Sequence, residues 1–234
     1  MNLNNQNKNS IVNNVFDTVN KKYDLMNDLM SFGVHRQWKK NLIEWMGPSK
    51  NEKLIDVASG TGDIANLFSN KLNGQCSVEC VEPNLNMLKI GKKKLTNKKN
   101  INWHNNYAEK LPFKSNTFDY YSISFGIRNT SNIEKSLTEA YRVLKPGGKF
   151  FCLEFSKVEN EIINLLYKNY SKLIPSLGKI IVGDDRPYKY LTESIKKFYS
   201  QDEFVGIMEK SGFHSIEYRN LNSGIAAIHR GWKI

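Results

Sequence analysis

The sequence contains no long hydrophobic run. None of its 234 residues lies in an unbroken apolar stretch of about 18 residues, the length that a membrane-spanning helix needs. Residues 1–10 are rich in asparagine and have neither an apolar centre nor an arginine, so they predict neither a secretory signal nor a mitochondrial presequence. We therefore expect a disordered tail over 1–10, a single domain over 11–234 because no linker or repeat interrupts it, and a cytoplasmic location in a bacterium.

Cysteine is also scarce. The three cysteines, Cys76, Cys80 and Cys152, are an odd number, which argues against a disulfide framework and favours a reducing compartment. Cys76 and Cys80 are four residues apart and have no pair of histidines near them in the sequence. Structural zinc sites usually need four such ligands, so we predict no metal site.

Arginine is rare although the chain is basic. Of the 34 basic residues only 6 are arginine, and the net charge is +11. Arginine makes the forked contacts to phosphate and guanine that are typical of nucleic-acid recognition, so we expect no nucleic-acid partner. The lysine excess is consistent either with contact to an anionic membrane surface or with a compositional bias that also produced 29 asparagines.

Short apolar runs alternate with amphipathic segments along most of the chain. The predicted strands cover residues 54–58, 77–82, 101–104, 120–124, 149–155, 215–219 and 224–230. The predicted helices lie near residues 12–19, 38–46, 64–69, 84–95, 133–143, 161–174 and 202–210, with turns at 145–148 and a polar, tyrosine-rich loop at 183–190. Strands that alternate with helices predict an α/β protein with a doubly wound, mostly parallel sheet.

A glycine-rich turn follows the first predicted strand. Residues 56–63 read Asp-Val-Ala-Ser-Gly-Thr-Gly-Asp, and Glu82 ends the next strand 20 residues after Gly62. Ligands bind at the carboxyl ends of strands in such sheets, and an acid at this spacing can accept both ribose hydroxyls of an adenosine group. An ordinary strand-to-helix turn is the alternative. The dinucleotide pattern is incomplete because Ala65 replaces its third glycine, and Asp56 would repel a pyrophosphate but attract a cation. The turn therefore favours S-adenosylmethionine over NAD.

Four longer motifs are more specific. They are residues 23–38 (YDLMNDLMSFGVHRQW), 124–129 (SFGIRN), 142–156 (RVLKPGGKFFCLEFS) and 224–233 (GIAAIHRGWK). In this order they resemble the signatures of the UbiE/COQ5 quinone methyltransferases, from about Val12 to the end of the chain. The resemblance implies a class I, Rossmann-like methyltransferase fold with an antiparallel C-terminal strand, N-terminal helices and a helical cover.

The resemblance also implies where the cofactor binds. Gly60 and Gly62 would shape the turn, Asp56 would precede it, and the contacts to S-adenosylmethionine would come from Thr61, Glu82, Tyr107, Ala108 and Ser124. Three positions depart from the usual family pattern. Ser59 replaces a glycine, Glu82 replaces the commoner aspartate, and Tyr107 replaces an asparagine, which removes an amide from the adenine region and offers a ring face instead.

The reaction implied is methyl transfer to a ring carbon of a quinol, in ubiquinone or menaquinone biosynthesis or both. The quinol must lose a phenolic proton, so a general base is expected near it. His35 is a candidate because its ordinary pKa is near neutrality, a structural hydrogen bond being the alternative. Arg128 would hold a developing phenolate, and Asn129 lies beside it. Asp184 and Asp185 in the polar loop are further candidates, a solvated loop being the alternative, and Tyr23, Asp24 and Asn27 on the N-terminal helix are candidates for lining the pocket.

The substrate's polyprenyl tail requires an apolar groove or access to a bilayer. The amphipathic segment 161–174 is predicted to cover the pocket or to touch the inner face of the cytoplasmic membrane. A homodimer or a complex of quinone-synthesis enzymes would also fit. The alternatives in function are another class I small-molecule methyltransferase and a non-catalytic, cofactor-binding subunit, which Tyr107 favours. Binding of S-adenosylmethionine without turnover would identify the latter.

Overall fold

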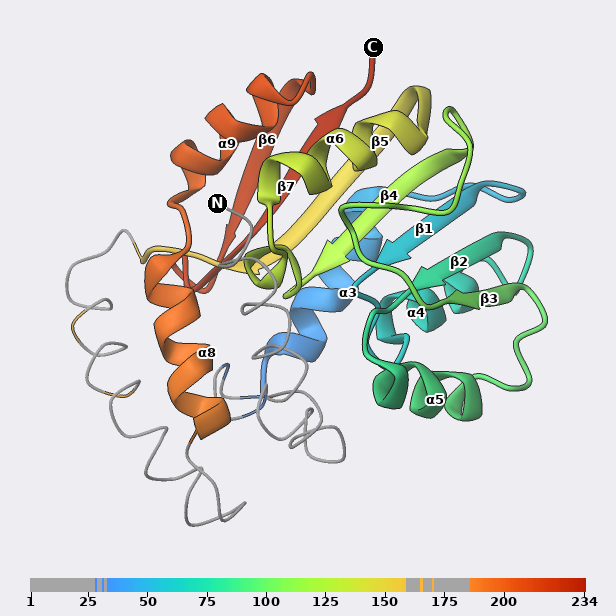
Figure 1. Cartoon of the computed structure of the whole chain (residues 1–234), viewed down its shortest axis with the longest axis horizontal. Coiled ribbons are helices and arrows are strands. Elements are labelled where there is room, and N and C mark those ends of the chain that lie inside the picture. The colour runs from blue at the N-terminus through green and yellow to red at the C-terminus, as the bar shows by residue number, and fades with distance from the viewer. Residues whose placement is uncertain (1–27, 29–30, 32, 159–164, 166–169, 171–185) are drawn as a thin grey trace.

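The structure is a computed structural model of the whole chain. It describes residues 28, 31, 33–158, 165, 170 and 186–234, which are coloured in Figure 1. The predicted tail over 1–10, the candidates Tyr23, Asp24, Asn27, Asp184 and Asp185, and nearly all of segment 161–174 lie outside these residues. No helix in the described ranges combines the length and the hydrophobicity that crossing a membrane requires.

The strands form one sheet, which crosses the molecule diagonally in Figure 1. They are β1 (Lys53–Val57), β2 (Ser77–Val81), β3 (Ile101–His104), β4 (Phe118–Ser124), β5 (Leu144–Phe155), β6 (His214–Leu221) and β7 (Ala226–Trp232). Their order is β3-β2-β1-β4-β5-β7-β6, and all neighbours pair in parallel except that β7 is antiparallel to both β5 and β6. This confirms the predicted doubly wound, mostly parallel sheet with an antiparallel C-terminal strand.

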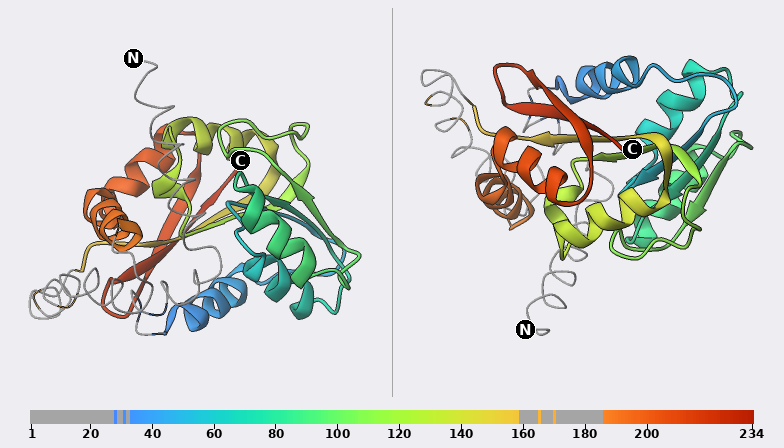
Figure 2. Two further views of the ribbon diagram at one scale, coloured as in Figure 1. Left: turned by 60° about the horizontal axis from the view of Figure 1, so that its bottom comes forward. Right: turned by 90° about the horizontal axis from the view of Figure 1, so that it is seen from above.

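Helices cover both faces of the sheet. They are α3 (His35–Met46), α4 (Asp63–Lys71), α5 (Leu85–Lys94), the 3₁₀ turn η1 (Ile127–Asn129), α6 (Ile133–Val143), α8 (Arg186–Lys197) and α9 (Gln201–Lys210). In Figure 2, α3 and α4 lie on one face, and α6 and α9 lie on the other. Asparagine and serine side chains cap three of these helices at their N-termini, with Asn84 on α5, Asn132 on α6 and a capping box from Ser200 on α9.

A predicted loop and a predicted turn differ from the structure. The segment 186–190 is not a loop but the first turns of α8, where Pro187 is tolerated because an orphan N–H is lost at no cost. Buried Tyr188 and Leu191 show the helical spacing that its charged neighbours concealed. The turn at 145–148 lies inside β5 as an irregularity, where Gly147 has a φ of 80° and the register against β4 shifts, and the Gly147 N–H donates to the carbonyl of Lys233 at 2.7 Å.

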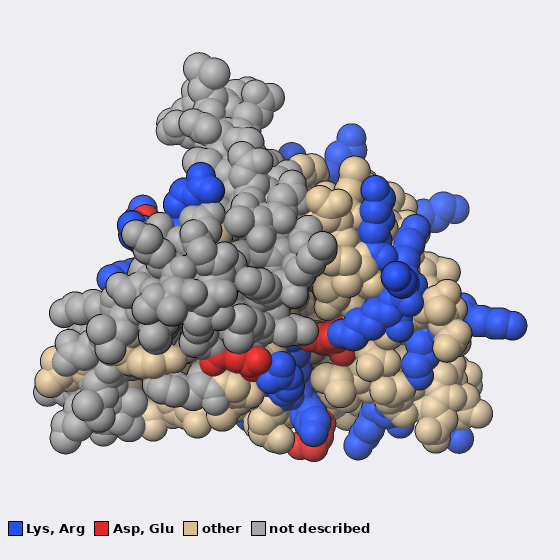
Figure 3. Space-filling model, turned by 90° about the horizontal axis from the view of Figure 1, so that it is seen from below, with Lys and Arg blue, Asp and Glu red and all other residues tan. Residues whose placement is uncertain are grey.

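One face of the molecule carries a group of exposed basic side chains. Lysine and arginine gather on the right side of Figure 3, at the end of the molecule that carries α5 in Figure 1. Exposed lysines on α5 contribute to this patch, namely Lys89, Lys92, Lys93 and Lys94. Leu85, the first residue of the same helix, leaves 55% of its surface exposed.

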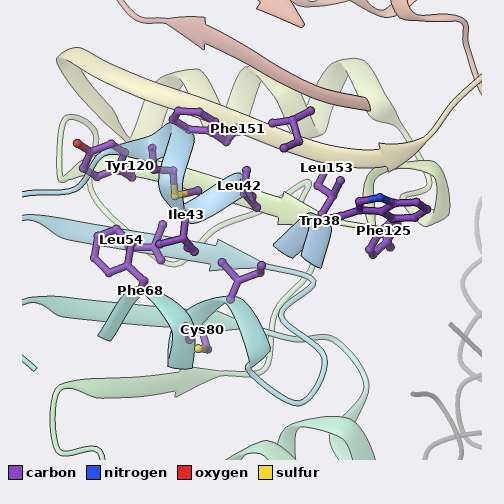
Figure 4. Close-up of a cluster of buried hydrophobic side chains, with 14 of the residues drawn as sticks. Trp38, Leu42, Ile43, Leu54, Phe68, Cys80, Tyr120, Phe125, Phe151 and Leu153 are labelled. Atoms are coloured by element: carbon purple, nitrogen blue, oxygen red, sulfur yellow. The ribbon is translucent and has the colours of Figure 1, made fainter. Parts of the chain in front are cut away.

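An aromatic cluster joins α3 to the carboxyl ends of β4 and β5 (Figure 4). The ring of Trp38 lies 6.3 Å from that of Phe125 and 5.9 Å from that of Phe155, centroid to centroid. Its indole N–H donates to Asn222 Oδ1 at 2.6 Å, which satisfies the buried polar atom. Trp38 is therefore a core residue that anchors α3 beside the loop after β4.

Gly91 lies inside α5, and its replacement by alanine is expected to destabilise the protein. Alanine normally stabilises a helix interior relative to glycine by about 0.5–1 kcal/mol. A Cβ on Gly91 would lie 2.1 Å from Cη2 of Trp103, so we expect Gly91→Ala to lower the free energy of unfolding by about 2 kcal/mol through overpacking. Gly206 in α9 has nothing within 4 Å of its Cβ position, so Gly206→Ala should raise stability. Urea unfolding of both variants tests this, and equal shifts would contradict it.

Candidate active site

The glycine turn adopts a backbone conformation that requires its glycines. Gly60 and Gly62 have φ values of 57° and 83°, in the left-handed region. The N–H of Gly62 donates to the carbonyl of Ser59 at 2.9 Å, which closes the turn before α4. A Cβ on Gly62 would lie 2.8 Å from Leu95 Cδ1 and 3.0 Å from Trp103. Gly62 is thus needed both for its φ and for the close packing of the turn against Leu95 and Trp103.

Glu82 holds this turn in place. It follows β2 and is 6% exposed. Its Oε2 accepts the N–H of Gly60 at 2.8 Å, and its Oε1 accepts the N–H of Asn84 at 2.9 Å. Burial raises the pKa of the carboxyl to about 7, although both backbone bonds favour the ionised form. Each carboxylate oxygen has a second lone pair, so Glu82 can accept two ribose hydroxyls without releasing the turn.

Asp56 is buried at the carboxyl end of β1. It is 1% exposed, and its Oδ1 accepts the hydroxyl of Ser122 at 2.7 Å. Its Oδ2 accepts no hydrogen bond of good geometry among the described residues, although the backbone N–H of Ala65 lies near enough to lower the pKa of the carboxyl. Burial raises the pKa of Asp56 to about 7, and the bond from Ser122 opposes that rise. A buried carboxylate with one oxygen unsatisfied is well suited to a cationic ligand group.

The turn, Asp56 and the end of β4 enclose one hollow. Its lining consists of Lys39, Asp56, Ala58, Ser59, Gly60, Thr61, Asp63, Ile64, Ser124 and Phe125. The hydroxyl of Ser124 is buried and has no partner among the described residues. The structure therefore brings together Asp56, Gly60, Thr61 and Ser124 as predicted, with Glu82 joined through Gly60. Acceptors for an ammonium group and a ribose diol fit the polar groups of S-adenosylmethionine. Lys39 and Asp63 also line the hollow, although no role was predicted for them from the sequence.

Tyr107 and Ala108 lie apart from this hollow. Ala108 is 6% exposed and packs in the core on the α6 side of the sheet, whereas Tyr107 is 41% exposed. The loop that carries them is nevertheless tied to Glu82. Asn105 Nδ2 donates to the carbonyl of Glu82 at 2.9 Å and to that of Pro83 at 2.8 Å. This role of Asn105 was not predicted from the sequence, because the contact with Glu82 depends on where the loop after β3 lies in the fold.

Arg128 is held in a buried ion pair. Its guanidinium donates to Oε1 of Glu154 on β5 and, at 2.9 Å, to the carbonyl of Phe125. The side chains of Arg128 and Glu154 are 3% and 1% exposed. Burial raises the pKa of Glu154, and the charge of Arg128 opposes that rise. Glu154 lies within a predicted motif, but its pairing with a residue 26 positions earlier depends on the register of β4 and β5.

A second hollow adjoins Arg128 on the side of α8. Its volume is about 420 Å³, and it is lined by Arg128, Ile133, Tyr190, Glu193, Ser194, Lys197, Phe198 and Tyr199. The hydroxyl of Tyr190 donates to Asn129 Oδ1 at 3.0 Å, and so orients that amide. Arg128 and Asn129 thus lie together on η1, and the bond from Arg128 to the carbonyl of Phe125 joins the lining of this hollow to that of the first. Tyr190 was not predicted because α8 was not.

His35 occupies neither hollow. It is 1% exposed, and its Nε2 lies 3.0 Å from Asp28 Oδ1. Burial is the main reason why its pKa is lowered, and the nearby charge of Lys39 adds to it. In this position at the start of α3 the imidazole has the hydrogen-bonded, structural environment that was the alternative to a catalytic role.

The raised pKa values predict that cofactor binding depends on pH. Asp56 and Glu82 both have a pKa of about 7, and both must be ionised to bind a cation and two hydroxyls. Each group that must lose a proton weakens binding about tenfold per pH unit below its pKa. Affinity for S-adenosylmethionine should therefore fall between about pH 8 and about pH 6. Calorimetry in buffers of different ionisation enthalpy measures the affinity and the protons released, and a flat profile would contradict the assignment.

As pH rises, Asp56 and Glu82 lower the stability of the free protein while they raise its affinity for the cofactor. Their folded-state pKa values lie above the ordinary values of aspartate and glutamate, so without a ligand they stabilise the folded state less as pH rises towards 7. Because the ligand requires the ionised forms, the increase in melting temperature that it causes should grow over this range.

Comparison with known proteins agrees with this geometry. Residues 2–233 match the ubiE/COQ5 methyltransferase family. The chain is 48% identical over 233 residues to the ubiquinone/menaquinone biosynthesis C-methyltransferase UbiE of Brucella abortus, with 97% of this chain and 87% of that one covered. Among solved structures it is similar to a SAM-dependent methyltransferase from Thermotoga maritima (TM-score 0.68, 19% identity, covering 94% of this chain and 99% of that one).

A second solved structure shares the fold. It is a Haemonchus contortus N-methyltransferase in complex with phosphomonomethylethanolamine and S-adenosylhomocysteine (TM-score 0.65, 14% identity, covering 94% of this chain and 60% of that one). At such identities the two solved structures establish the fold alone. The residues of the site and the sequence relatives carry the chemistry.

Proposed function

The chain belongs to the ubiE/COQ5 methyltransferase family, and we propose that it methylates a ring carbon of a polyprenylated quinol in ubiquinone biosynthesis, menaquinone biosynthesis or both. It is an S-adenosylmethionine-dependent C-methyltransferase. The observation that supports this proposal best is the contact between Glu82 and Gly60, which joins the ribose-binding acid to the glycine turn at the ligand edge of the sheet. The name of the Brucella relative specifies the quinone pathways.

The cofactor supplies an electrophilic methyl group, and the protein supplies positioning and electrostatics. In our proposal, Glu82 binds the ribose, Asp56 attracts the cationic amino-acid half, and Thr61 and Ser124 line the hollow between them. The quinol ring occupies the hollow beside Arg128. There the guanidinium, fixed by Glu154, stabilises the negative charge that develops on the phenol oxygen, and Asn129, oriented by Tyr190, fixes the ring.

The proposal is tested by methyl transfer in vitro. Purified protein and labelled S-adenosylmethionine are mixed with a reduced methoxy-polyprenyl-benzoquinol, a reduced demethylmenaquinol or the oxidised form of each. We expect a C-methylated product from one or both quinols and none from the oxidised controls. Cofactor binding without transfer to either quinol would contradict the proposal and identify a non-catalytic, cofactor-binding subunit instead.

We further propose that the enzyme meets its apolar substrate at an anionic membrane surface. The segment 161–174, predicted for this contact, lies outside the described residues except for exposed Leu165 and for Tyr170. The basic patch on α5 and its exposed Leu85 add support, since α5 begins just after Glu82. Co-sedimentation with phosphatidylglycerol vesicles should exceed that with phosphatidylcholine vesicles and fall with salt. Equal binding to both would count against it. A homodimer or a larger complex stays a prediction.

A further inference from the structure

Lys39 is a buried cation in the cofactor hollow that the predicted contacts do not use. It lies on α3, its side chain is 8% exposed, and it lines the same hollow as Asp56, Thr61 and Ser124. Its Nζ lies 2.7 Å from Asp63 Oδ2. Removing an ammonium group from water is costly, so a lysine in this position calls for a physical reason.

Neutralising Asp63 is an insufficient reason. Asp63 already has a second cation, because Lys94 Nζ lies 2.5 Å from its Oδ1 from the exposed side. It is also the first residue of α4, where the helix dipole stabilises a negative charge. Although burial raises the pKa of Asp63, the two lysines outweigh that effect and hold it below its usual range. Asp63 is thus better explained as the group that positions Lys39.

The charges of the hollow match a zwitterion. The methionine half of S-adenosylmethionine carries an α-ammonium and an α-carboxylate. Asp56 provides an acid for the first, with Oδ2 unsatisfied among the described residues. An ammonium group has three N–H donors. Within the described part of the chain, the ammonium group of Lys39 donates one hydrogen bond, to Asp63. Lys39 is the cation that lines this hollow beside Asp56.

We infer that Lys39 binds the α-carboxylate of S-adenosylmethionine, with Asp63 holding its ammonium group in position. This inference rests on the proposed cofactor site and assigns to it a contact for the amino-acid end. It makes the site selective for a ligand that carries the carboxylate. It also explains why a cationic cofactor is bound next to a lysine, since the carboxylate lies between the two positive charges.

The test compares two ligands that differ only in that carboxylate. Calorimetry measures the dissociation constants of S-adenosylmethionine and of decarboxylated S-adenosylmethionine with the wild-type protein and with Lys39→Met. Wild type should prefer the complete cofactor by about 10- to 100-fold, the range for a charge-assisted contact. Lys39→Met should lose most of that preference because it binds the complete cofactor more weakly while its affinity for the decarboxylated ligand stays within about threefold. Lys39→Arg should recover part of it.

Two matched controls separate this role from a structural one. Lys94→Met removes the other partner of Asp63 without changing the lining of the hollow, and Lys40→Met removes an exposed neighbour. Both should keep the wild-type preference. Equal weakening of both ligands in Lys39→Met, or the same loss in Lys94→Met, would overturn the inference.

The wild-type protein can still overturn the inference if Lys39→Met does not fold, and Lys39→Arg then provides the comparison at this position. A wild-type protein that binds the two ligands equally overturns the inference but leaves the cofactor site intact. A wild-type protein that binds neither ligand contradicts the cofactor site itself, and with it the role of Lys39.

Discussion

Replacing Glu82 with glutamine is expected to weaken S-adenosylmethionine binding about 100-fold. The carboxylate accepts the N–H groups of Gly60 and Asn84 while retaining lone pairs for the ribose. An amide has only one oxygen, so its NH₂ group must face one of these N–H donors. The variant therefore loses a charged acceptor for the ribose and also the bond that fixes the turn. Calorimetry at about pH 8, where Glu82 is ionised, measures the loss.

A glutamate on the same strand provides the control. Glu79 lies on β2 and accepts from Asn102 Nδ2 at 2.9 Å, away from the turn. Glu79→Gln should leave the dissociation constant within about twofold of wild type, because it alters no group in the hollow. If Glu82→Gln binds the cofactor as tightly as Glu79→Gln does, the ribose contact is wrong.

Replacing Arg128 with methionine is expected to lower the free energy of unfolding by about 3 kcal/mol. The change leaves Glu154 buried, 1% exposed and without its cation. An uncompensated buried carboxylate is among the costliest single defects in a protein. Urea unfolding at about pH 8 measures the loss, which should diminish at lower pH as Glu154 takes up a proton, since burial already raises its pKa.

Two further variants separate stability from chemistry. Lys145→Met breaks a pair with Asp119 in which the two side chains are 39% and 24% exposed, so it should cost about 1 kcal/mol or less. The double variant Arg128→Met/Glu154→Met removes both buried charges and should recover most of the lost stability. If it folds but transfers no methyl group while still binding S-adenosylmethionine, Arg128 acts on the substrate. Full activity would limit Arg128 to a structural role.

The elements that could be predicted are those whose signal is local. Short apolar runs predict β1, β2, β4 and β5, and the amphipathic segment 133–143 predicts α6. α8 was missed because charged residues and Pro187 at its start are typical of a loop. The buried face of α8 is recognised only in the folded structure, where Tyr188 and Leu191 pack in the core.

The same distinction holds within the site. The sequence alone was enough to predict the glycine turn and its spacing to Glu82, because one strand–helix–strand unit brings both to the same edge of the sheet. It also determined the family, through motifs that are continuous in the chain. The position of Lys39 in the hollow and the contacts of Glu154 with Arg128 and of Tyr190 with Asn129 became apparent from the folded structure. These contacts join residues on separate elements, so they depend on strand register and helix packing, which no local pattern encodes.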